Sequence, residues 1–273
     1  MHISINGELL SLEEAGVLTS EGYNFGYGLF ETIKVKDFKL VFWREHMDRL
    51  SRGLRKIGLD DDIDRELMFL SSNELIELNG LENGALKIIV SKNRDSKDVV
   101  LTTRTADYPE ELYSRGFNLN ISSCRRNPHS IIPYVKSLNY MENVIEREKS
   151  LQAGCDDCLF LNTENHVAET SISNLFFIKD RTVFTPRLEC GLLDGIVRSK
   201  VVEIVGELGY TVEEGDYIIT ELLNADESFL TNSLMGVMPI GSLGEKLYET
   251  SNFKITGEIR KRYGERANAE IDA

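Results

Sequence analysis

The amino-acid sequence predicts an α+β protein of two lobes. Its 273 residues, 41% of them hydrophobic, suffice for one large core or two modest ones. Short apolar strands flank helical segments in the first half, and strands and helices alternate between glycine and asparagine turns in the second. Residues 108–115 are polar and show no clear periodicity. We therefore predict a small lobe from residues 1–112 and a larger lobe from residues 113–273.

The small lobe is expected to combine strands with two helices. Apolar side chains repeat every three or four positions from Met47 to Ile57, which predicts an amphipathic helix over residues 43–57, ended by Gly58. A second helix is expected at residues 63–78. The expected strands cover residues 3–6, 9–10, 32–35, 40–42, 85–91 and 99–103.

The larger lobe is expected to alternate strands and helices. Its expected strands cover residues 117–123, 158–162, 166–169, 175–178 and 183–184. Its expected helices cover residues 138–153, 194–208 and 252–266. The stretches 218–224, 228–231 and 236–240 lie before the last helix.

The stretch of residues 134–145 organises this larger lobe. Four apolar side chains recur in it at helical spacing: Leu138, Met141, Val144 and Ile145. The spacing predicts a helix after Ser137 whose apolar face packs on a core, with Ser137 or Asn139 as its N-cap. Because Pro133 favours extended backbone before it, Lys136 is expected to project from a strand-to-helix junction. An amine in that position is a candidate nucleophile.

Composition excludes several classes of partner. The net charge of −14 and the sequence pI of about 4.9 leave no basic surplus to bind a nucleic-acid backbone. No apolar run approaches the roughly 18 residues of a membrane span, and the first six residues lack the basic and apolar regions of a signal peptide. We expect a cytoplasmic protein without a nucleic-acid or membrane partner.

The four cysteines do not predict a metal site. Cys155 and Cys158 have the spacing of a redox or metal pair, but no second pair exists, and Cys124 and Cys190 stand alone. Cys158 leads into an apolar run that predicts a buried strand. We therefore expect small thiols in cores or loops.

Three features of the larger lobe together indicate a phosphorylated aldehyde cofactor. Lys136 can form a Schiff base when it is deprotonated, and Glu169 ends a strand before a run of hydroxyl and amide side chains. The glycine-bearing turn at residues 191–198 opens a helix and presents backbone N–H groups to a phosphate. A lysine, a carboxylate and phosphate-binding turns are the requirements of pyridoxal 5′-phosphate, whose ring nitrogen pairs with an acidic side chain.

Four motifs give the chain a resemblance to the fold-type IV pyridoxal-phosphate enzymes, also called class-IV aminotransferases. They are Phe-Gly-Tyr-Gly-Leu-Phe-Glu-Thr at residues 25–32, Lys-Ser-Leu-Asn at 136–139, Glu-Thr-Ser-Ile-Ser-Asn at 169–174 and Thr-Asn-Ser-Leu-Met-Gly-Val-Met-Pro at 231–239. The resemblance implies a small N-terminal α/β lobe, a larger β-barrel-like C-terminal lobe with helices, and a homodimer acting on a small-molecule amino substrate.

The resemblance also implies roles for individual residues. Lys136 resembles the Schiff-base lysine, which also moves the proton at the substrate carbon, and Glu169 resembles the partner of the pyridine nitrogen. Arg49 matches the phosphate-binding arginine, and His46 is expected to pack beside it. Tyr140 is either a partner of the ring hydroxyl or a tyrosine at the core edge. The remaining phosphate ligands are expected from Ile196, Val197, Ser233 and Leu234.

Two positions depart from the family pattern. Val197 stands where many relatives have threonine, which removes a hydroxyl donor, although backbone N–H groups could replace it. Tyr27 stands where many relatives have aspartate. Neither change touches Lys136 or Glu169, so cofactor binding remains the expectation.

The reaction is expected to be that of 4-amino-4-deoxychorismate lyases, which release pyruvate and form 4-aminobenzoate, the folate precursor. Residues 85–90 lack the Tyr-Ile-Arg-Pro type of run of bacterial branched-chain enzymes, and residues 92–96 lack the Arg-x-His pair of D-amino-acid aminotransferases. Residues 231–239 resemble the lyase version of their loop. The alternative is an aminotransferase that uses branched-chain or D-amino acids with 2-oxoglutarate. A nucleotide-binding protein is disfavoured because no Walker or dinucleotide glycine motif is present.

Overall fold

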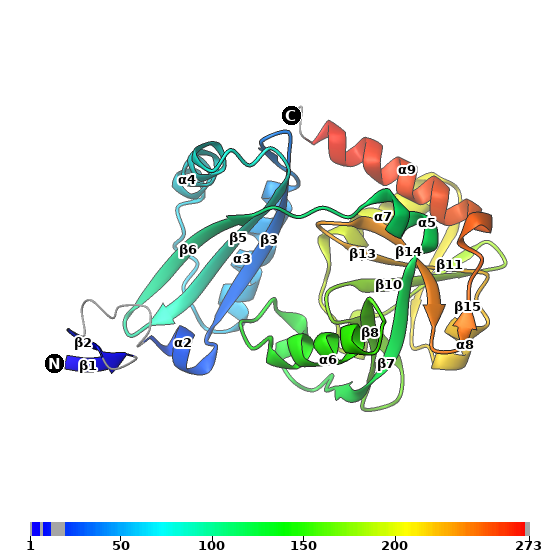
Figure 1. Cartoon of the computed structure of the whole chain (residues 1–273), viewed down its shortest axis with the longest axis horizontal. Coiled ribbons are helices and arrows are strands. Elements are labelled where there is room, and N and C mark those ends of the chain that lie inside the picture. Colours follow the sequence, from blue (N-terminus) through cyan, green and yellow to red (C-terminus); the bar gives the residue numbers. More distant parts are fainter. Residues whose placement is uncertain (1, 6–7, 12–19, 271–273) are drawn as a thin grey trace.

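Two β-sheets, formed by separate halves of the chain, frame the molecule (Figure 1). The computed structural model describes residues 2–5, 8–11 and 20–270. Within these residues, an N-terminal hairpin pairs β1 (His2–Ile5) with β2 (Glu8–Ser11), which confirms the two short strands predicted there. Residue 6 of the first predicted strand lies outside the described residues.

The smaller sheet has the strand order β4-β3-β5-β6 and is antiparallel throughout. Its strands are β3 (Gly28–Lys36), β4 (Lys39–Leu40), β5 (Gly84–Asn93) and β6 (Ser96–Arg104). Three helices accompany it: α2 (Glu21–Phe25), α3 (Trp43–Lys56) and α4 (Arg65–Leu78). The apolar face of α3 packs on β3 and β5, as its spacing predicted, so one face of this sheet is covered.

The larger sheet has the strand order β12-β11-β10-β13-β14-β7-β8-β9, with β15 beside β14. Its strands are β7 (Phe117–Arg126), β8 (Asp157–Asn162), β9 (Val167–Thr170), β10 (Asn174–Lys179), β11 (Thr182–Pro186), β12 (Thr211–Gly215), β13 (Glu227–Asn232), β14 (Gly236–Leu243) and β15 (Lys246–Leu247). The sheet curls until β9 approaches β10 and β11. One core therefore lies inside this half-barrel, with residues such as Leu119, Leu159, Leu175 and Leu230.

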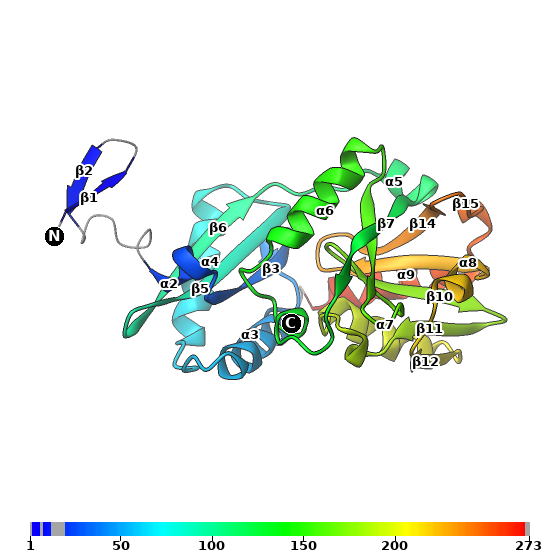
Figure 2. The same ribbon diagram turned by 90° about the horizontal axis from the view of Figure 1, so that it is seen from below.

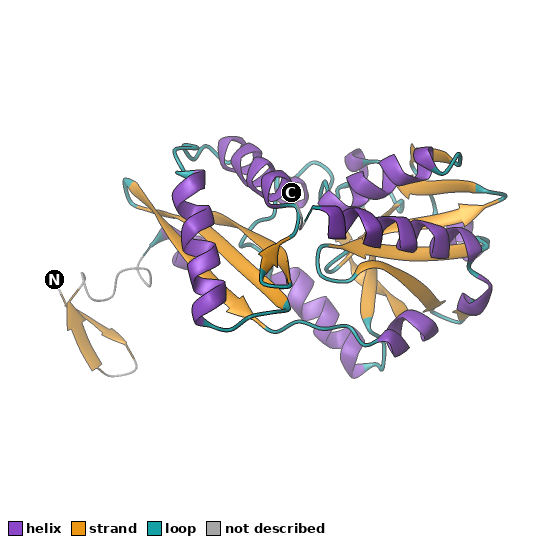
Figure 3. Ribbon diagram, turned by 90° about the horizontal axis from the view of Figure 1, so that it is seen from above, coloured by secondary structure: helices purple, strands orange, loops and turns teal. Residues whose placement is uncertain are grey.

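Helices close the outside of the half-barrel. They are α5 (Glu110–Arg115), α6 (Met141–Gln152), α7 (Ile196–Glu207), α8 (Ile219–Leu223) and α9 (Lys254–Ala269). The long helices α7 and α9 pack on one another and on β13, where Ile204 and Ile259 meet Phe229 (Figure 3). The predicted α+β architecture is thus confirmed, with each sheet forming a half-barrel.

Some elements differ from the sequence prediction. Residues 110–115, in which the sequence showed no clear periodicity, form α5. Strands β12 and β15 were not predicted; both lie at the edge of the sheet and are largely exposed, so little apolar pattern marks them. The division at residue 112 remains a prediction.

The buried face of helix α6 is the opposite of the one that the sequence predicted. Met141 is 74% exposed, and Val144 and Ile145 are exposed with it, so the apolar face does not pack on a core. The buried side chains are instead polar: Asn143 donates to the Ser171 carbonyl at 2.6 Å, and Glu146 accepts from Ser122. These hydrogen bonds hold the buried face of α6 against β7 and the loop after β9, and Figure 2 shows α6 beside β7.

The start of α6 also corrects a prediction. The helix begins at Met141, later than expected, and Tyr140 occupies the N-cap position. The Ser137 hydroxyl accepts from the Asn139 backbone N–H, and the Asn139 amide donates to the Gly26 carbonyl at 2.9 Å, so both side chains serve the preceding turn. Neither predicted N-cap therefore caps the helix.

All four cysteines are free thiols, and Cys158 and Cys190 are buried. Burial raises the pKa of Cys158 to about 12, which leaves it an unreactive core side chain at neutral pH. Among the described residues, we find no helix with the length and apolar character needed to cross a bilayer.

Candidate active site

Lys136 lies in a short irregular segment that is hydrogen-bonded to the beginning of β3. The Phe30 N–H donates to the Lys136 carbonyl at 2.8 Å, and the Leu138 N–H donates to the Gly28 carbonyl at 3.0 Å. A Cβ atom on Gly28 would come within 2.6 Å of the Val90 carbonyl oxygen, so only glycine allows this close approach. The glycine-rich motif thus fixes the backbone that carries the lysine.

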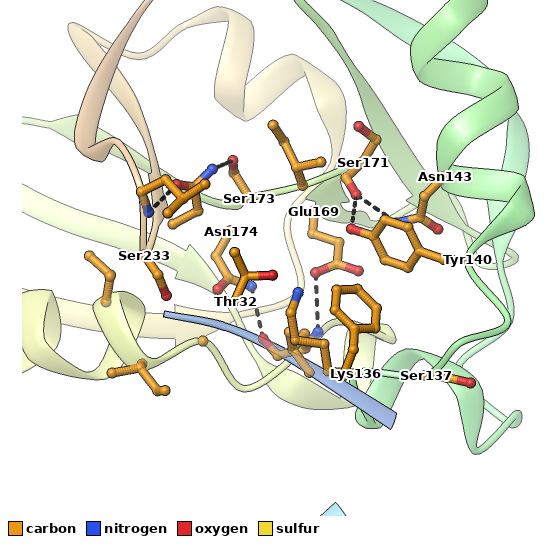
Figure 4. A pocket seen from close by; sticks show the side chains of 18 of the residues that line it. Thr32, Lys136, Ser137, Tyr140, Asn143, Glu169, Ser171, Ser173, Asn174 and Ser233 are labelled. Carbon is orange, nitrogen blue, oxygen red and sulfur yellow. Dashed lines mark hydrogen bonds between the residues drawn. The ribbon is translucent and has the colours of Figure 1, made fainter. Parts of the chain in front are cut away.

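A cavity of about 420 Å³ lies between the two sheets, and Lys136 projects into it (Figure 4). The cavity gathers every site residue that the sequence suggested, from positions far apart in the chain. These residues are Arg49, Lys136, Tyr140, Glu169, Ile196, Val197, Ser233 and Leu234. Their individual roles remain predictions, and their convergence on one cavity is what the structure adds.

The environment of Lys136 favours a neutral amine. Its Nζ atom lies 4.4 Å from the centroid of the Phe30 ring. Burial, reinforced by the positive charge of Arg49, lowers the pKa of Lys136 to about 8. At neutral pH a larger fraction of this amine is therefore nucleophilic than of an exposed lysine.

Arg49 is held in the cavity by a buried carboxylate. Its Nε and Nη2 atoms donate to the two oxygens of Glu31 at 2.8 and 2.5 Å, and Nη1 donates to the Asp194 carbonyl. Burial opposes ionisation of Glu31, but Arg49 and the hydrogen bond with His46 outweigh it and lower the Glu31 pKa to about 2. His46 packs beside the arginine as expected, with its Nδ1 atom 2.8 Å from Glu31.

Glu169 lines the same cavity as Arg49. One carboxylate oxygen accepts from the Leu193 N–H at 3.1 Å, and the other lies 3.5 Å from Arg126. Burial raises the pKa of Glu169, although Arg126 partly opposes the shift. A raised pKa makes this carboxyl a strong hydrogen-bond partner for a protonated ring nitrogen.

The first turn of α7 and the end of β13 together form an anion-binding cradle. Gly195 is the N-cap of α7, and a Cβ there would overlap the Asn174 side chain, so a larger residue would displace Asn174. The backbone N–H groups of Ile196 and Val197 begin the helix and have no hydrogen-bond acceptor within the described chain. The buried Thr231 hydroxyl likewise has no partner. This donor set fits a phosphate group, even without the hydroxyl that Val197 lacks.

Tyr140 lines the cavity, and its hydroxyl is hydrogen-bonded within the protein. The hydroxyl donates to the Ser171 carbonyl at 2.5 Å, and the ring meets Phe30 edge-on with 5.3 Å between centroids. Burial raises the Tyr140 pKa, so the phenol stays protonated. The other departure from the family pattern, Tyr27, lies outside the cavity and donates to the Ile57 carbonyl.

Sequence reasoning missed the partners that position these groups. Glu31 holds Arg49, and Arg126 contacts Glu169 while donating to Asn143. The cavity also receives Lys87, Arg104 and Arg147, for which no role was predicted. Side chains alternate between the two faces of a strand, so the sequence could have placed Glu31 on the face of β3 that α3 covers. The α3 residue that Glu31 contacts depends on the register between strand and helix, which the sequence does not give.

Comparison with known proteins agrees with this fold. Residues 28–243 match the family model described as amino-transferase class IV. An aminodeoxychorismate lyase from Vibrio harveyi is 29% identical over 83% of this chain and 86% of its own. A putative branched-chain-amino-acid aminotransferase from Methanocaldococcus jannaschii is 28% identical over 97% and 95%. The crystal structure of a putative 4-amino-4-deoxychorismate lyase from Legionella pneumophila superposes with a TM-score of 0.86, at 28% identity, covering 92% of this chain and 95% of that one.

The fold and cavity define a two-lobed fold-type IV enzyme. Because the family model spans most of its length, the chain belongs to the class IV aminotransferases, a family of pyridoxal-phosphate enzymes that contains both lyases and aminotransferases. The resemblance stated from the sequence motifs is thereby confirmed.

Proposed function

We propose that this protein is a pyridoxal-phosphate-dependent 4-amino-4-deoxychorismate lyase that forms 4-aminobenzoate and pyruvate. The observation that carries the proposal is a lysine with a lowered pKa in one cavity with Glu169 and an anion cradle. Relatives and a solved structure of similar identity carry the lyase name. The proposal places the enzyme in the cytoplasm, where 4-aminobenzoate would serve folate synthesis.

Each group in the cavity has a task in this proposal. Lys136 would bind the cofactor aldehyde, Glu169 its ring nitrogen, and Arg49 with the N–H groups at the start of α7 its phosphate. When bound, the cofactor supplies an electron sink for negative charge at the amine-bearing carbon of the substrate. Because its pKa is lowered to about 8, a larger fraction of Lys136 Nζ is neutral than of an exposed lysine, and the neutral amine would take the proton from that carbon. The rings of Phe30 and Tyr140 limit water access to that amine.

A paired assay tests the reaction. The purified, cofactor-loaded protein is supplied with 4-amino-4-deoxychorismate and, separately, with leucine or D-alanine plus 2-oxoglutarate. We expect 4-aminobenzoate and pyruvate in equal amounts, and loss of both products and of the cofactor absorbance band in Lys136→Ala. Keto acid from the amino acids without any aminobenzoate would refute the lyase proposal.

An aminotransferase is the second candidate because relatives of equal similarity carry that name. The Methanocaldococcus protein, at 28% identity, and a D-alanine aminotransferase from Bacillus licheniformis, also at 28%, both match most of the chain. The same paired assay decides between the candidates.

We also propose that the enzyme is a homodimer in which a second copy covers the apolar face of α6. Met141, Val144 and Ile145 share this exposed face. Phe25 is also exposed, and the Gly26 carbonyl that follows it accepts from the Asn139 amide shortly before α6. Exposed apolar side chains grouped in this way are typical of protein interfaces. The polar side of the helix already meets its own sheet, so the apolar side is left for a partner.

Light scattering coupled to size-exclusion chromatography tests the dimer. We expect Ile145→Glu to convert the dimer to a monomer because it places a charge on this face. Leu78→Glu is the matched control, since Leu78 is an equally apolar, exposed helical residue on α4. A wild-type monomer, or a dimer that persists in Ile145→Glu, would contradict the proposed interface.

A further inference from the structure

The cavity is strongly cationic in a protein whose net charge is −14. Among its lining residues, six are basic and only Glu169 is acidic. Arg49 pairs with Glu31, Arg126 pairs with Glu142 and approaches Glu169, and Lys136 is the proposed nucleophile. Three basic residues remain after these are assigned: Lys87, Arg104 and Arg147. Within the described chain, none of these three side chains takes part in an ion pair or a hydrogen bond, although the charge of Arg147 opposes the rise that burial causes in the pKa of Asp157.

Two of the remaining cations share one face of the small sheet. In the pairing of β5 with β6, Lys87 lies opposite Thr102 and Ala85 lies opposite Arg104, so Lys87 and Arg104 are diagonal neighbours. Burial and the charge of Arg104 both lower the pKa of Lys87. Like charges held side by side without a counterion are unfavourable, and an anion bound between them would relieve the repulsion.

The third cation reaches the cavity from the opposite wall. Arg147 extends from α6, and its Nε atom is buried without a hydrogen-bond partner. Burial raises the pKa of Tyr108, while the charges of Arg147 and Arg104 both oppose this shift, so the phenol lies near both guanidinium groups. A buried guanidinium nitrogen without an acceptor is costly, which favours a ligand that supplies one.

We infer that Lys87, Arg104 and Arg147 form a subsite for carboxylates that are remote from the reacting amine of the substrate. The inference rests on the proposed function, because it takes Lys136 as the point where the amine is held. The Phe30 ring centroid is 4.4 Å from Lys136 Nζ and 4.8 Å from Lys87 Nζ, which limits the two nitrogens to a separation of about 9 Å. A ring substrate with its amine and carboxylates on different ring positions fits this span.

The subsite distinguishes two classes of substrate. In an α-amino acid, the carboxylate is attached to the reacting carbon and stays close to Lys136. In a cyclic amine that carries two carboxylates, both anions lie away from that carbon, where guanidinium groups can bind them through paired hydrogen bonds. A cationic cleft in an acidic protein also concentrates dianions over monoanions. The subsite therefore selects cyclic dicarboxylates.

Calorimetric binding of ligands without an amine tests the subsite separately from the reaction. The probes are 3-(carboxymethoxy)benzoate, a ring with two carboxylates, and benzoate, a ring with one, each titrated into the cofactor-loaded protein. We expect the dicarboxylate to bind at least about tenfold more tightly. Arg104→Gln and Arg147→Gln should each weaken the dicarboxylate about tenfold, with the cofactor absorbance band unchanged. Arg44→Gln, which removes an exposed arginine of α3 outside the cavity, is the matched control and should bind like wild type.

The outcomes separate this inference from the proposed function. Equal affinity for the two probes, or unchanged dicarboxylate affinity in both arginine variants, would overturn the subsite even if aminobenzoate is formed. Selective dicarboxylate binding that is lost in both variants would support the subsite even if the lyase assay gave no product.

Discussion

In the part of the chain that the structure describes, positive side chains are paired with a carboxylate at one end of the cavity and unpaired at the other. At the inner end, Arg49 is fixed by two hydrogen bonds to Glu31 and one to the Asp194 carbonyl, and Glu31 is 1% exposed. At the outer end, Lys87 and Arg104 face the cavity without a carboxylate partner in the described chain. A cation with a built-in counterion is held in one geometry, whereas a cation without one is free to bind an anion from solution.

The paired and the unpaired end of the cavity fit different kinds of ligand. A group that remains through every turnover, such as a cofactor phosphate, needs fixed donors, and the paired inner end provides them. A substrate that enters and leaves needs charges that are not already neutralised. The comparison predicts that inner-end substitutions affect stability and that outer-end substitutions affect binding.

Removing the inner counterion should have the largest effect on stability. We expect Glu31→Gln to lower the free energy of unfolding of the cofactor-free protein by about 3 kcal/mol at pH 7, because Arg49 would be left buried without its counterion. Urea unfolding measures the loss. The control Glu45→Gln breaks a more exposed pair with Lys200 and should cost under about 1 kcal/mol.

The contribution of Glu31 to the free energy of unfolding depends on pH. The pKa of Glu31 falls from 4.5 to about 2 on folding, so its contribution is complete above pH 4.5 and is lost as the pH falls towards 2. The gap in stability between wild type and Glu31→Gln should therefore shrink between pH 4.5 and pH 2. A gap that stays constant over that range, or one no larger than that of Glu45→Gln at pH 7, would contradict the inner-end argument.

Cofactor attachment should follow the titration of Lys136. Below its pKa of about 8 the amine is protonated, so the rate at which pyridoxal phosphate attaches to the cofactor-free protein should rise about tenfold per pH unit and level off above pH 8. The absorbance change on mixing measures this rate. Nα-acetyl-lysine, with an ordinary amine, should show a rate that continues to rise past pH 9; the same continued rise in the protein would argue against a lowered pKa.

The smallest effect on stability is expected at the outer end. Arg104→Gln should change the free energy of unfolding by no more than about 0.5 kcal/mol, because no ion pair of the described chain is lost and one repulsion with Lys87 is removed. Urea unfolding beside Glu31→Gln gives the contrast directly. A loss as large as that of Glu31→Gln would show that Arg104 is structural.

The sequence predicted those parts of the fold and site that local pattern determines. The periodicity of α3 located its buried face, whereas Arg49, Lys136 and Glu169 were assigned to one site through the family motifs. Helix α6 was predicted incorrectly because an apolar stripe indicates only which side chains share a face. It does not indicate whether the chain's own core or another molecule covers that face. In α6 the buried face carries the polar residues Asn143 and Glu146.

The supporting charges could not be predicted because they depend on register. Glu31 meets Arg49 only because the α3 side of β3 faces that turn of α3, and Lys87 meets Arg104 only through the pairing of β5 with β6. Neither relation is encoded at short range in the sequence.

The hydrogen bonds that join the Lys136 segment to β3 have a consequence for folding. The Asn139 side chain and the Gly26 carbonyl that it binds are 113 positions apart in the chain, so this contact closes only after both halves have met. The lowered pKa of Lys136 depends on the same burial, and an incompletely folded chain therefore carries an ordinary, protonated lysine. The amine therefore acquires its raised reactivity towards aldehydes only in the folded structure that buries it.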